Sequence, residues 1–383
     1  MHQNRQNLLV NCHIERFLTF FLVTAILKNL CSFVQFWDPP TFFFFAVLGT
    51  KANFFLLFLM TSKSKRKKKK VKHEPISQII INSLNSNKLF YSFEYSAARD
   101  ADPNDLFARI QRMTNDLMPS WIDITWGFGN VGQRSIEMSK RVQKELSIPV
   151  LLHFILTDRT TQQIEQDLQA IRNAGIRNLL ALRGYTQAGY DKWQPTESIS
   201  GSCPPPQHTD GLVSFIKERH ADWFSIGVAG FPEGHPESTN LSEDVMHLKL
   251  KIDAGGEFII CQFCYDANVF HDFVKRCRAV GISVPIIPGV MPLTEYSTAK
   301  LLSDTWNVKL GDDIYNELKR CEEEDEIETG REAGKKYVVD LCDNLLNVQK
   351  KKGKGESGGI HFFVYDAEYE VRGLIDGIEK LEK

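Results

Sequence analysis

The feature that most constrains the fold of this chain is an alternation of short apolar runs with amphipathic segments, which recurs eight times after Leu89. Continuous apolar runs such as IPVLLHFIL are typical of parallel strands that are buried on both faces. The expected strands are Leu89 to Glu94, Trp121 to Thr125, Pro149 to Ile155, Asn178 to Leu182, Phe224 to Ala229, Phe258 to Phe263, Val284 to Pro288 and Ile360 to Val364. Eight such units predict an α/β protein with a (β/α)8 TIM barrel, and a doubly wound open sheet is the alternative.

The segments between the strands have helical spacing. Leu106, Ile110 and Met113 form one apolar stripe behind an expected N-cap at Asp102, with Pro103 in the first turn. The long segment from Leu302 to Gly359 exceeds the length of one connection, so extra helices are expected between strands 7 and 8, most clearly over 337–348. The Lys/Gly-rich residues 350–359 are expected to form a flexible connection.

Polar residues mark the carboxyl ends of five expected strands, namely Glu94, Thr125, His153, Arg183 and Gln262. In a TIM barrel the active site lies at this end. Glu94 is notable because it ends an otherwise apolar strand between Phe93 and Tyr95. Burial disfavours the charged form of a carboxyl group, so this setting predicts a raised pKa and suits a general acid. The alternative is that Glu94 is a surface or salt-bridged residue.

The first 60 residues differ in composition from the rest, with 12 of the 26 phenylalanines. Phe17 to Trp37 and Thr41 to Met60 are each about long enough to cross a bilayer. Residues 1–60 therefore predict a membrane anchor, or else an artefact of the gene model with translation starting at Met60. Residues 61–87 hold the basic run KSKRKKKKVK and are expected to be a disordered leader, followed by the catalytic barrel over 88–383.

The overall charge and the cysteines narrow the class of protein. A formal net charge of -2 argues against a nucleic-acid binder, and eight scattered cysteines indicate a reduced, cytoplasmic protein unless the anchor is genuine. Cys261 and Cys264 form a CxxC, but two further ligands with zinc-site spacing are not evident, so no metal is expected.

Once the strand ends are aligned, an ordered set of motifs resembles the catalytic barrel of methylenetetrahydrofolate reductase, from about Lys88 to Lys383. The motifs are SFE ending at Glu94, DITWG from Asp123, ALRG from Ala181, VAGFPEGHPES from Val228, KIDAGGEFIICQF from Lys251 and PIIPGVMP from Pro285. The ordered set is more specific than any single member.

The resemblance implies a flavin-dependent oxidoreductase of one-carbon metabolism. FAD would take a hydride from NADPH or NADH and pass it to 5,10-methylenetetrahydrofolate, giving 5-methyltetrahydrofolate for methionine synthesis. The family's general acid corresponds to Glu94. The flavin-binding positions correspond to Thr125, His153, Arg183, Tyr185, Phe231, His235, Asp244, His247 and Lys251. The folate-binding positions correspond to Gln262, Tyr296 and Phe363. A homo-oligomer is expected, without nucleic acid.

This sequence departs from the family pattern at three places. Ser96, Ala97 and Ala98 stand where a Pro-Pro pair usually follows the glutamate, so the loop backbone is less rigid. Tyr185 stands where the family has an aspartate beside the flavin and the pterin, which removes a negative charge. HFF at 361–363 continues as VYD where the family has TLN.

Two further readings stay open at the level of sequence. One is a catalytically impaired paralogue that binds flavin or folate in a regulatory or subunit role, and the other is an unrelated flavin-dependent barrel. The family's eukaryotic relatives also carry a C-terminal regulatory domain that binds S-adenosylmethionine, and no segment of this sequence corresponds to it.

Overall fold

The computed structural model describes residues 74–97, 102–126, 131–157, 159–184, 206, 208–235, 237–306, 308–350 and 358–381, together with two short strands at 47–50 and 53–56. The chain divides into two units, Met1–Lys68 and Lys69–Lys383. In the first unit, β1 (Val47–Thr50) and β2 (Asn53–Leu56) form an antiparallel pair. They lie within the second expected membrane block, and the rest of both blocks is outside the described residues. No helix in the part of the chain that the structure describes is long and apolar enough to cross a membrane.

The second unit is a closed parallel barrel of eight strands, so the prediction of a TIM barrel is confirmed and the open sheet is wrong. In barrel order the strands are β3 (Phe90–Tyr95), β4 (Trp121–Ile124), β5 (Val150–Ile155), β6 (Asn178–Leu182), β7 (Ser225–Gly230), β8 (Phe258–Phe263), β9 (Ile286–Val290) and β10 (Gly359–Phe363). Pairing of β10 with β3 closes the barrel, with Phe363 beside Glu94.

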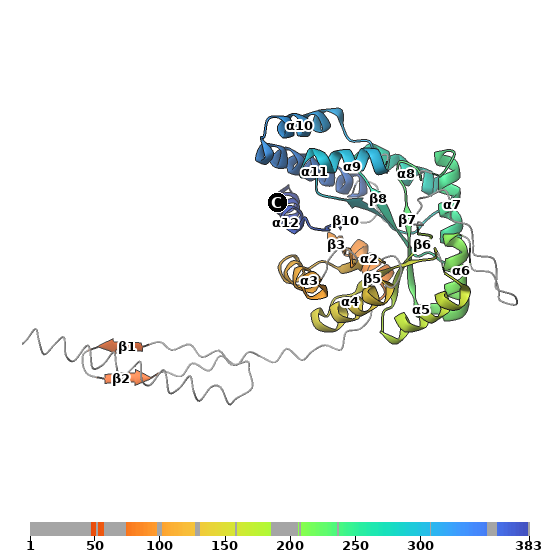
Figure 1. The fold of residues 1–383 in the computed structure, drawn as a ribbon, viewed down its shortest axis with the longest axis horizontal. Helices are drawn as coiled ribbons and strands as arrows, with labels where there is room; N and C mark the ends of the chain where they lie inside the picture. The colour runs from red at the N-terminus through yellow and green to blue at the C-terminus, as the bar shows by residue number, and fades with distance from the viewer. Residues whose placement is uncertain are drawn as a thin grey trace, which may run out of the picture. The chain divides into compact units, whose positions relative to one another are not determined.

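Helices surround the strands, as Figure 1 shows. The helices that follow β3 to β8 are α3 (Pro103–Leu117), α4 (Val131–Leu146), α5 (Thr161–Asn173), α6 (Thr209–His220) with the 3-10 turn η2 (Ala221–Trp223), α7 (Leu241–Asp253) and α8 (Ala267–Ala279). The expected cap of α3 is confirmed, because the Asp102 side chain accepts a hydrogen bond from the backbone N–H of Asn104.

The prediction of extra helices between the seventh and eighth strands is confirmed. After β9 come α9 (Tyr296–Trp306), α10 (Asp312–Glu323) and α11 (Ile327–Lys350), and α12 (Glu368–Leu381) follows β10. Helix α11 packs against α10, α8 and α12, so the insertion covers one side of the barrel (Figure 1). Most of the expected flexible connection, residues 351–357, lies outside the described residues.

Residues 76–85 correct the expectation of a disordered leader, because they form helix α2 (Ile76–Asn85). Ile76 and Ile80 are fully buried among side chains from the amino-terminal half of the barrel strands, including Phe90, Trp121 and Phe258. The Ile76 N–H also donates to the Asn178 side chain at 2.9 Å. Helix α2 therefore closes one end of the barrel. The sequence prediction missed this helix because its short amphipathic pattern follows a basic run.

Truncation of Ile80 should therefore destabilise the barrel. We expect Ile80→Ala to lower the free energy of unfolding by about 2 to 4 kcal/mol, because it removes a buried aliphatic side chain and leaves a cavity. Ile81→Ala is the matched control, since Ile81 is the next residue of the same helix and is 43% exposed. Urea unfolding of both variants measures the difference. Equal losses would show that α2 does not close the barrel.

Candidate active site

The inside of the barrel is divided into an apolar layer and a polar layer. Alternate residues of a barrel strand point inward. The first inward residues, such as Phe90, Trp121 and Leu151, belong to the apolar cluster under α2. Two and four residues further along the strands come polar side chains, namely Ser92 and Glu94 on β3, Asp123 on β4, His153 on β5, Gln262 on β8 and His361 on β10. The polar layer lies toward the carboxyl ends of the strands, where a barrel carries its active site.

Glu94 lies at the centre of this layer and is only 4% exposed. Its Oε2 lies 3.4 Å from His153 Nε2 and 3.3 Å from His361 Nε2. Its Oε1 accepts a hydrogen bond from the Tyr365 hydroxyl at 3.4 Å. The alternative of a surface glutamate is therefore wrong, whereas ion pairing with His153 is part of its environment.

Asp123 is the second buried carboxylate of the cluster and is fully enclosed. Its oxygens lie 3.5 Å from His153 Nε2 and 3.8 Å from His361 Nδ1, and they have no hydrogen bond of ordinary length among the described residues. Ser92 Oγ lies 2.9 Å from His361 Nδ1 and orients that ring. Two carboxylates and two imidazoles thus share a small space in which protons can be exchanged.

The proton distribution in this cluster corrects one expectation. Burial raises the pKa of Glu94, but His153, and then His361 and the Tyr365 hydroxyl, outweigh it, so the pKa lies below its ordinary value. Burial lowers the pKa of His153, but Glu94 and Asp123 outweigh it and the pKa is raised. The prediction that an apolar setting keeps Glu94 protonated near neutral pH is therefore wrong. These two directions favour His153 as the holder of the proton of the pair, with its Nε2 3.4 Å from Glu94 Oε2.

A second group of predicted residues gathers at the ends of β6 and β7 and on α7. Arg183 follows β6 and forms an ion pair of 2.5 Å with Glu237. Phe231 follows β7 and packs edge to face on His235, with ring centroids 4.7 Å apart. Burial lowers the pKa of His235, which favours the neutral ring. A neutral His235 ring is suited to packing contacts rather than to ion pairing.

Helix α7 contributes a carboxylate and an amine to the same group. Asp244 is buried in the first turn and accepts a hydrogen bond from the Ser238 hydroxyl at 3.0 Å. Lys251 lies two turns later, with its Nζ 3.4 Å from the Ala229 carbonyl and 6.0 Å from the centre of the Phe231 ring. Burial lowers the pKa of Lys251, against the opposing effect of Asp244. His247 lies between them on α7 and is exposed.

The remaining predicted residues fall in different places. Thr125 follows β4 and donates to Ser96 Oγ at 3.3 Å. Gln262 is half-buried, and its Oε1 has no hydrogen-bond partner among the residues described. Phe363 packs on Phe263 with ring centroids 4.6 Å apart. Tyr296 contacts Tyr315 of α10 rather than the Glu94 cluster, and Tyr185 lies outside the described residues.

Sequence reasoning missed Asp123, His361, Tyr365 and Glu237. The first two were detectable, because Asp123 lies two residues before Thr125, and His361 lies two residues before Phe363. A period of two places such pairs on the same inward face of a strand.

Three of the buried residues could hold a metal ion, since one ligand atom each from Glu94, Asp123 and His361 lies within 4.8 Å of the others. The absence of a metal stays a prediction.

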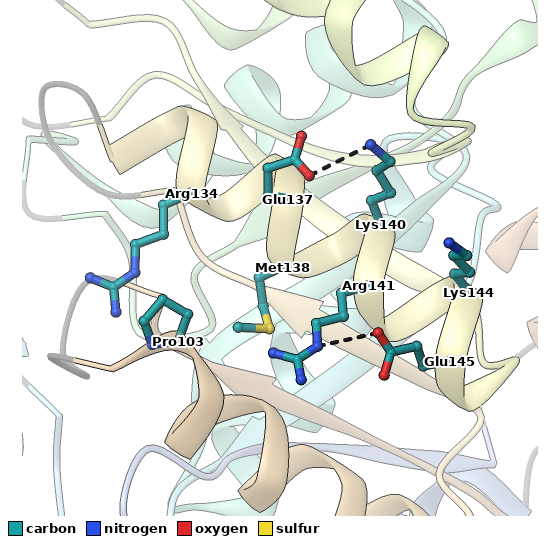
Figure 2. A pocket seen from close by; sticks show the side chains of 8 residues that line it. All are labelled: Pro103, Arg134, Glu137, Met138, Lys140, Arg141, Lys144 and Glu145. Atoms are coloured by element: carbon teal, nitrogen blue, oxygen red, sulfur yellow. Dashed lines mark ion pairs between the residues drawn. The ribbon is translucent and has the colours of Figure 1, made fainter. Parts of the chain in front are cut away.

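A groove on the outer surface is a separate feature. It has a volume of about 390 Å³ and runs along α4 beside Pro103, as Figure 2 shows. Charged side chains that line it pair along the helix, with 3.6 Å between Lys140 and Glu137 and 3.3 Å between Arg141 and Glu145. None of the predicted site residues lines this groove, which is therefore distinct from the candidate site.

Fold and site together define a class of protein, an α/β-barrel enzyme with a buried acid–base cluster at the carboxyl ends of its strands. The family profile for methylenetetrahydrofolate reductase matches residues 79–375, which covers most of the barrel. The chain belongs to the methylenetetrahydrofolate reductase family.

Curated relatives agree with this assignment. Methylenetetrahydrofolate reductase 2 of Saccharomyces cerevisiae is 34% identical over 68% of this chain and 43% of the relative. Methylenetetrahydrofolate reductase (NADH) 1 of Zea mays is 29% identical over 79% of this chain and 50% of the relative. A probable methylenetetrahydrofolate reductase (NADPH) of Caenorhabditis elegans is 28% identical, over 81% and 45%. The chain thus spans half or less of the length of these three relatives.

A solved structure is similar in fold. It is an uncharacterised protein from Clostridium thermocellum that binds two copies of 5-methyl-5,6,7,8-tetrahydrofolic acid. The TM-score is 0.51 at 14% sequence identity, over 79% of this chain and 99% of the other. The similarity supports the barrel fold.

Proposed function

We propose that this chain catalyses the FAD-dependent reduction of 5,10-methylenetetrahydrofolate to 5-methyltetrahydrofolate with NADPH or NADH. The observation that carries the proposal is the position of Glu94, in a buried polar layer at the carboxyl end of a barrel of this family. Relatives named for NADH and for NADPH both match, so the proposal includes either donor.

The residues present fit a flavin. Arg183 and Lys251 provide two cations for a diphosphate. Burial lowers the pKa of half-buried Lys251, because the groups around it compensate its positive charge incompletely. Phe231 and neutral His235 offer aromatic surface beside them. When bound, the flavin supplies hydride transfer between the nicotinamide and the folate.

Glu94 would deliver the proton that opens the bridging methylene group of the folate. Its carboxyl group lies 3.4 Å from His153 Nε2, an ion-pair contact that would have to align into a hydrogen bond for the proton to pass to Glu94 and then to the folate nitrogen. Asp123, buried beside both, stabilises the positive charge on His153 before transfer. The same negative charge favours the cationic iminium of the opened folate.

Gln262 would hold the pterin. Its buried Oε1 has no partner among the described residues, and a side-chain amide can both accept from and donate to a pterin edge. Phe363 forms an apolar wall beside it, on top of Phe263. Gly289 leaves room for that wall, since a Cβ at this position would lie 2.7 Å from the Phe363 ring.

An anaerobic two-step assay tests the proposal. The purified protein should show a flavin absorbance spectrum that bleaches with NADPH or NADH and returns when 5,10-methylenetetrahydrofolate is added. A flavin that is reduced but never reoxidised by the folate would instead support the impaired paralogue. A protein with folate affinity and no flavin spectrum would contradict the cofactor.

A further inference from the structure

We propose that the Tyr365 hydroxyl is a positioning group for Glu94, and that Arg109 of α3 holds the loop that carries it. The inference deepens the proposed function, because it rests on Glu94 as the acid. Tyr365 lies in the segment VYD, where the motif resemblance implies a departure from the family pattern.

The contacts divide the two oxygens of Glu94 between different partners. Oε2 faces the imidazoles of His153 and His361, at 3.4 and 3.3 Å. Oε1 receives the Tyr365 hydroxyl at 3.4 Å. Both oxygens of the carboxyl group therefore have partners. The hydrogen bond from the Tyr365 hydroxyl restricts rotation about the terminal torsion of the Glu94 side chain. Among the described residues, the carboxyl group of Asp123 on β4 also faces this cluster.

The backbone around Tyr365 is held in an uncommon conformation. Tyr365 has a φ of 45°, in the left-handed region that few residues other than glycine adopt. Arg109 donates a hydrogen bond to the Tyr365 carbonyl and forms ion pairs with Asp366, at 3.0 Å, and with Glu368. The side chains of Arg109 and Glu368 are 16% and 23% exposed, so their contact is partly shielded from water, whereas Asp366 is 68% exposed. One guanidinium group therefore fastens the start of the loop between β10 and α12.

The ring of Tyr365 is fixed from a second direction. It stacks on Phe363 with an angle of 16° between the ring planes and 6.5 Å between the centroids. The Val364 N–H also donates to the Glu94 carbonyl at 3.1 Å, which ties the two strand ends together. These side-chain and backbone contacts restrain the end of β3 and the loop after β10.

The test is Tyr365→Phe, which keeps the stacked ring and removes only the hydroxyl. The matched control is Tyr369→Phe, because Tyr369 is 84% exposed on α12. In the assay of folate reduction by the reduced protein, Tyr365→Phe should lower the plateau rate roughly 3- to 10-fold. Reduction of the flavin by NAD(P)H should be unchanged, because Glu94 takes no part in it.

The pH profile separates positioning from a general packing defect. The proton lost on the falling limb is shared between His153 and Glu94. The hydroxyl lowers the pKa of Glu94, so its removal raises the affinity of the pair for that proton and should move the falling limb of the rate to higher pH. A lower plateau without this movement, or the same movement in Tyr369→Phe, would overturn the inference.

A second measurement does not depend on catalysis. Carbon-13 NMR of glutamate-labelled protein follows the Glu94 carboxyl group, whose signal is assigned by its loss in Glu94→Gln. A higher titration midpoint in Tyr365→Phe than in the unmodified protein supports the inference, and an equal midpoint overturns it. If the unmodified protein does not reduce folate at all, the proposed function fails while this measurement still decides the role of Tyr365.

Discussion

Glu94→Gln is expected to stop folate reduction while leaving reduction of the flavin by NAD(P)H nearly intact. The amide keeps the shape of the side chain and can still accept the Tyr365 hydrogen bond, but it cannot relay a proton from His153. General acid catalysis contributes about 100- to 10 000-fold, so the rate of flavin reoxidation by 5,10-methylenetetrahydrofolate should fall by that factor.

Stopped-flow absorbance of the two half-reactions measures this difference directly. Glu137→Gln is the matched control, because Glu137 is exposed on α4 and pairs only with Lys140 among the contacts in Figure 2. An equal loss in both half-reactions would show that Glu94 supports the flavin site or the fold and is not the acid.

Lys251→Met is expected to weaken flavin binding strongly without weakening the fold. The amine lies at the carboxyl end of β7 beside Phe231, and burial lowers its pKa, so its charge is incompletely compensated by Asp244. Removing a charged hydrogen-bond donor to a diphosphate should raise the dissociation constant of FAD about 10- to 100-fold. Methionine fills similar space, and removing a poorly compensated charge costs little or no stability.

Flavin fluorescence titration and thermal unfolding of the flavin-free protein together test this expectation. Lys249→Met serves as the control, since Lys249 is on the same helix and pairs with Asp253 at the surface. If Lys251→Met binds FAD as tightly as Lys249→Met does, Lys251 is not a cofactor ligand. If it lowers the melting temperature markedly, Lys251 is a structural residue.

The barrel was predictable from local pattern, because each strand is an apolar run and each helix has its own apolar stripe. The bounds of β6 and β8 agree with the sequence prediction, whereas β9 begins two residues later than predicted, since its register with β8 starts at Ile286. Helix α2 was missed because only two of its residues, Ile76 and Ile80, are buried, and their contacts come from strands distant in sequence.

Part of the buried polar layer was predictable from the sequence, but its electrostatics were not. Glu94, His153 and Gln262 could be identified from the strand ends, because a parallel barrel brings those ends together. The pKa of Glu94 could not, since besides His153 it depends on His361 and Tyr365, which lie more than 260 residues away in sequence and adjacent in the barrel. Closure of β10 against β3 creates that contact, and no local pattern encodes it.

The central claim is that Glu94 transfers a proton to the folate, and the pH dependence of one half-reaction tests it most directly. The rate at which 5,10-methylenetetrahydrofolate reoxidises the reduced flavin would be measured anaerobically from about pH 5 to about pH 8. The pKa of Glu94 is lowered and that of neighbouring His153 is raised, so the proton available to the folate is lost as pH rises through the raised pKa of His153. The predicted result is a rate that falls with rising pH in the unmodified protein, and a profile without that fall in Glu94→Gln. A rate that rises with pH, or the same profile in both proteins, would contradict the assignment of Glu94 as the acid.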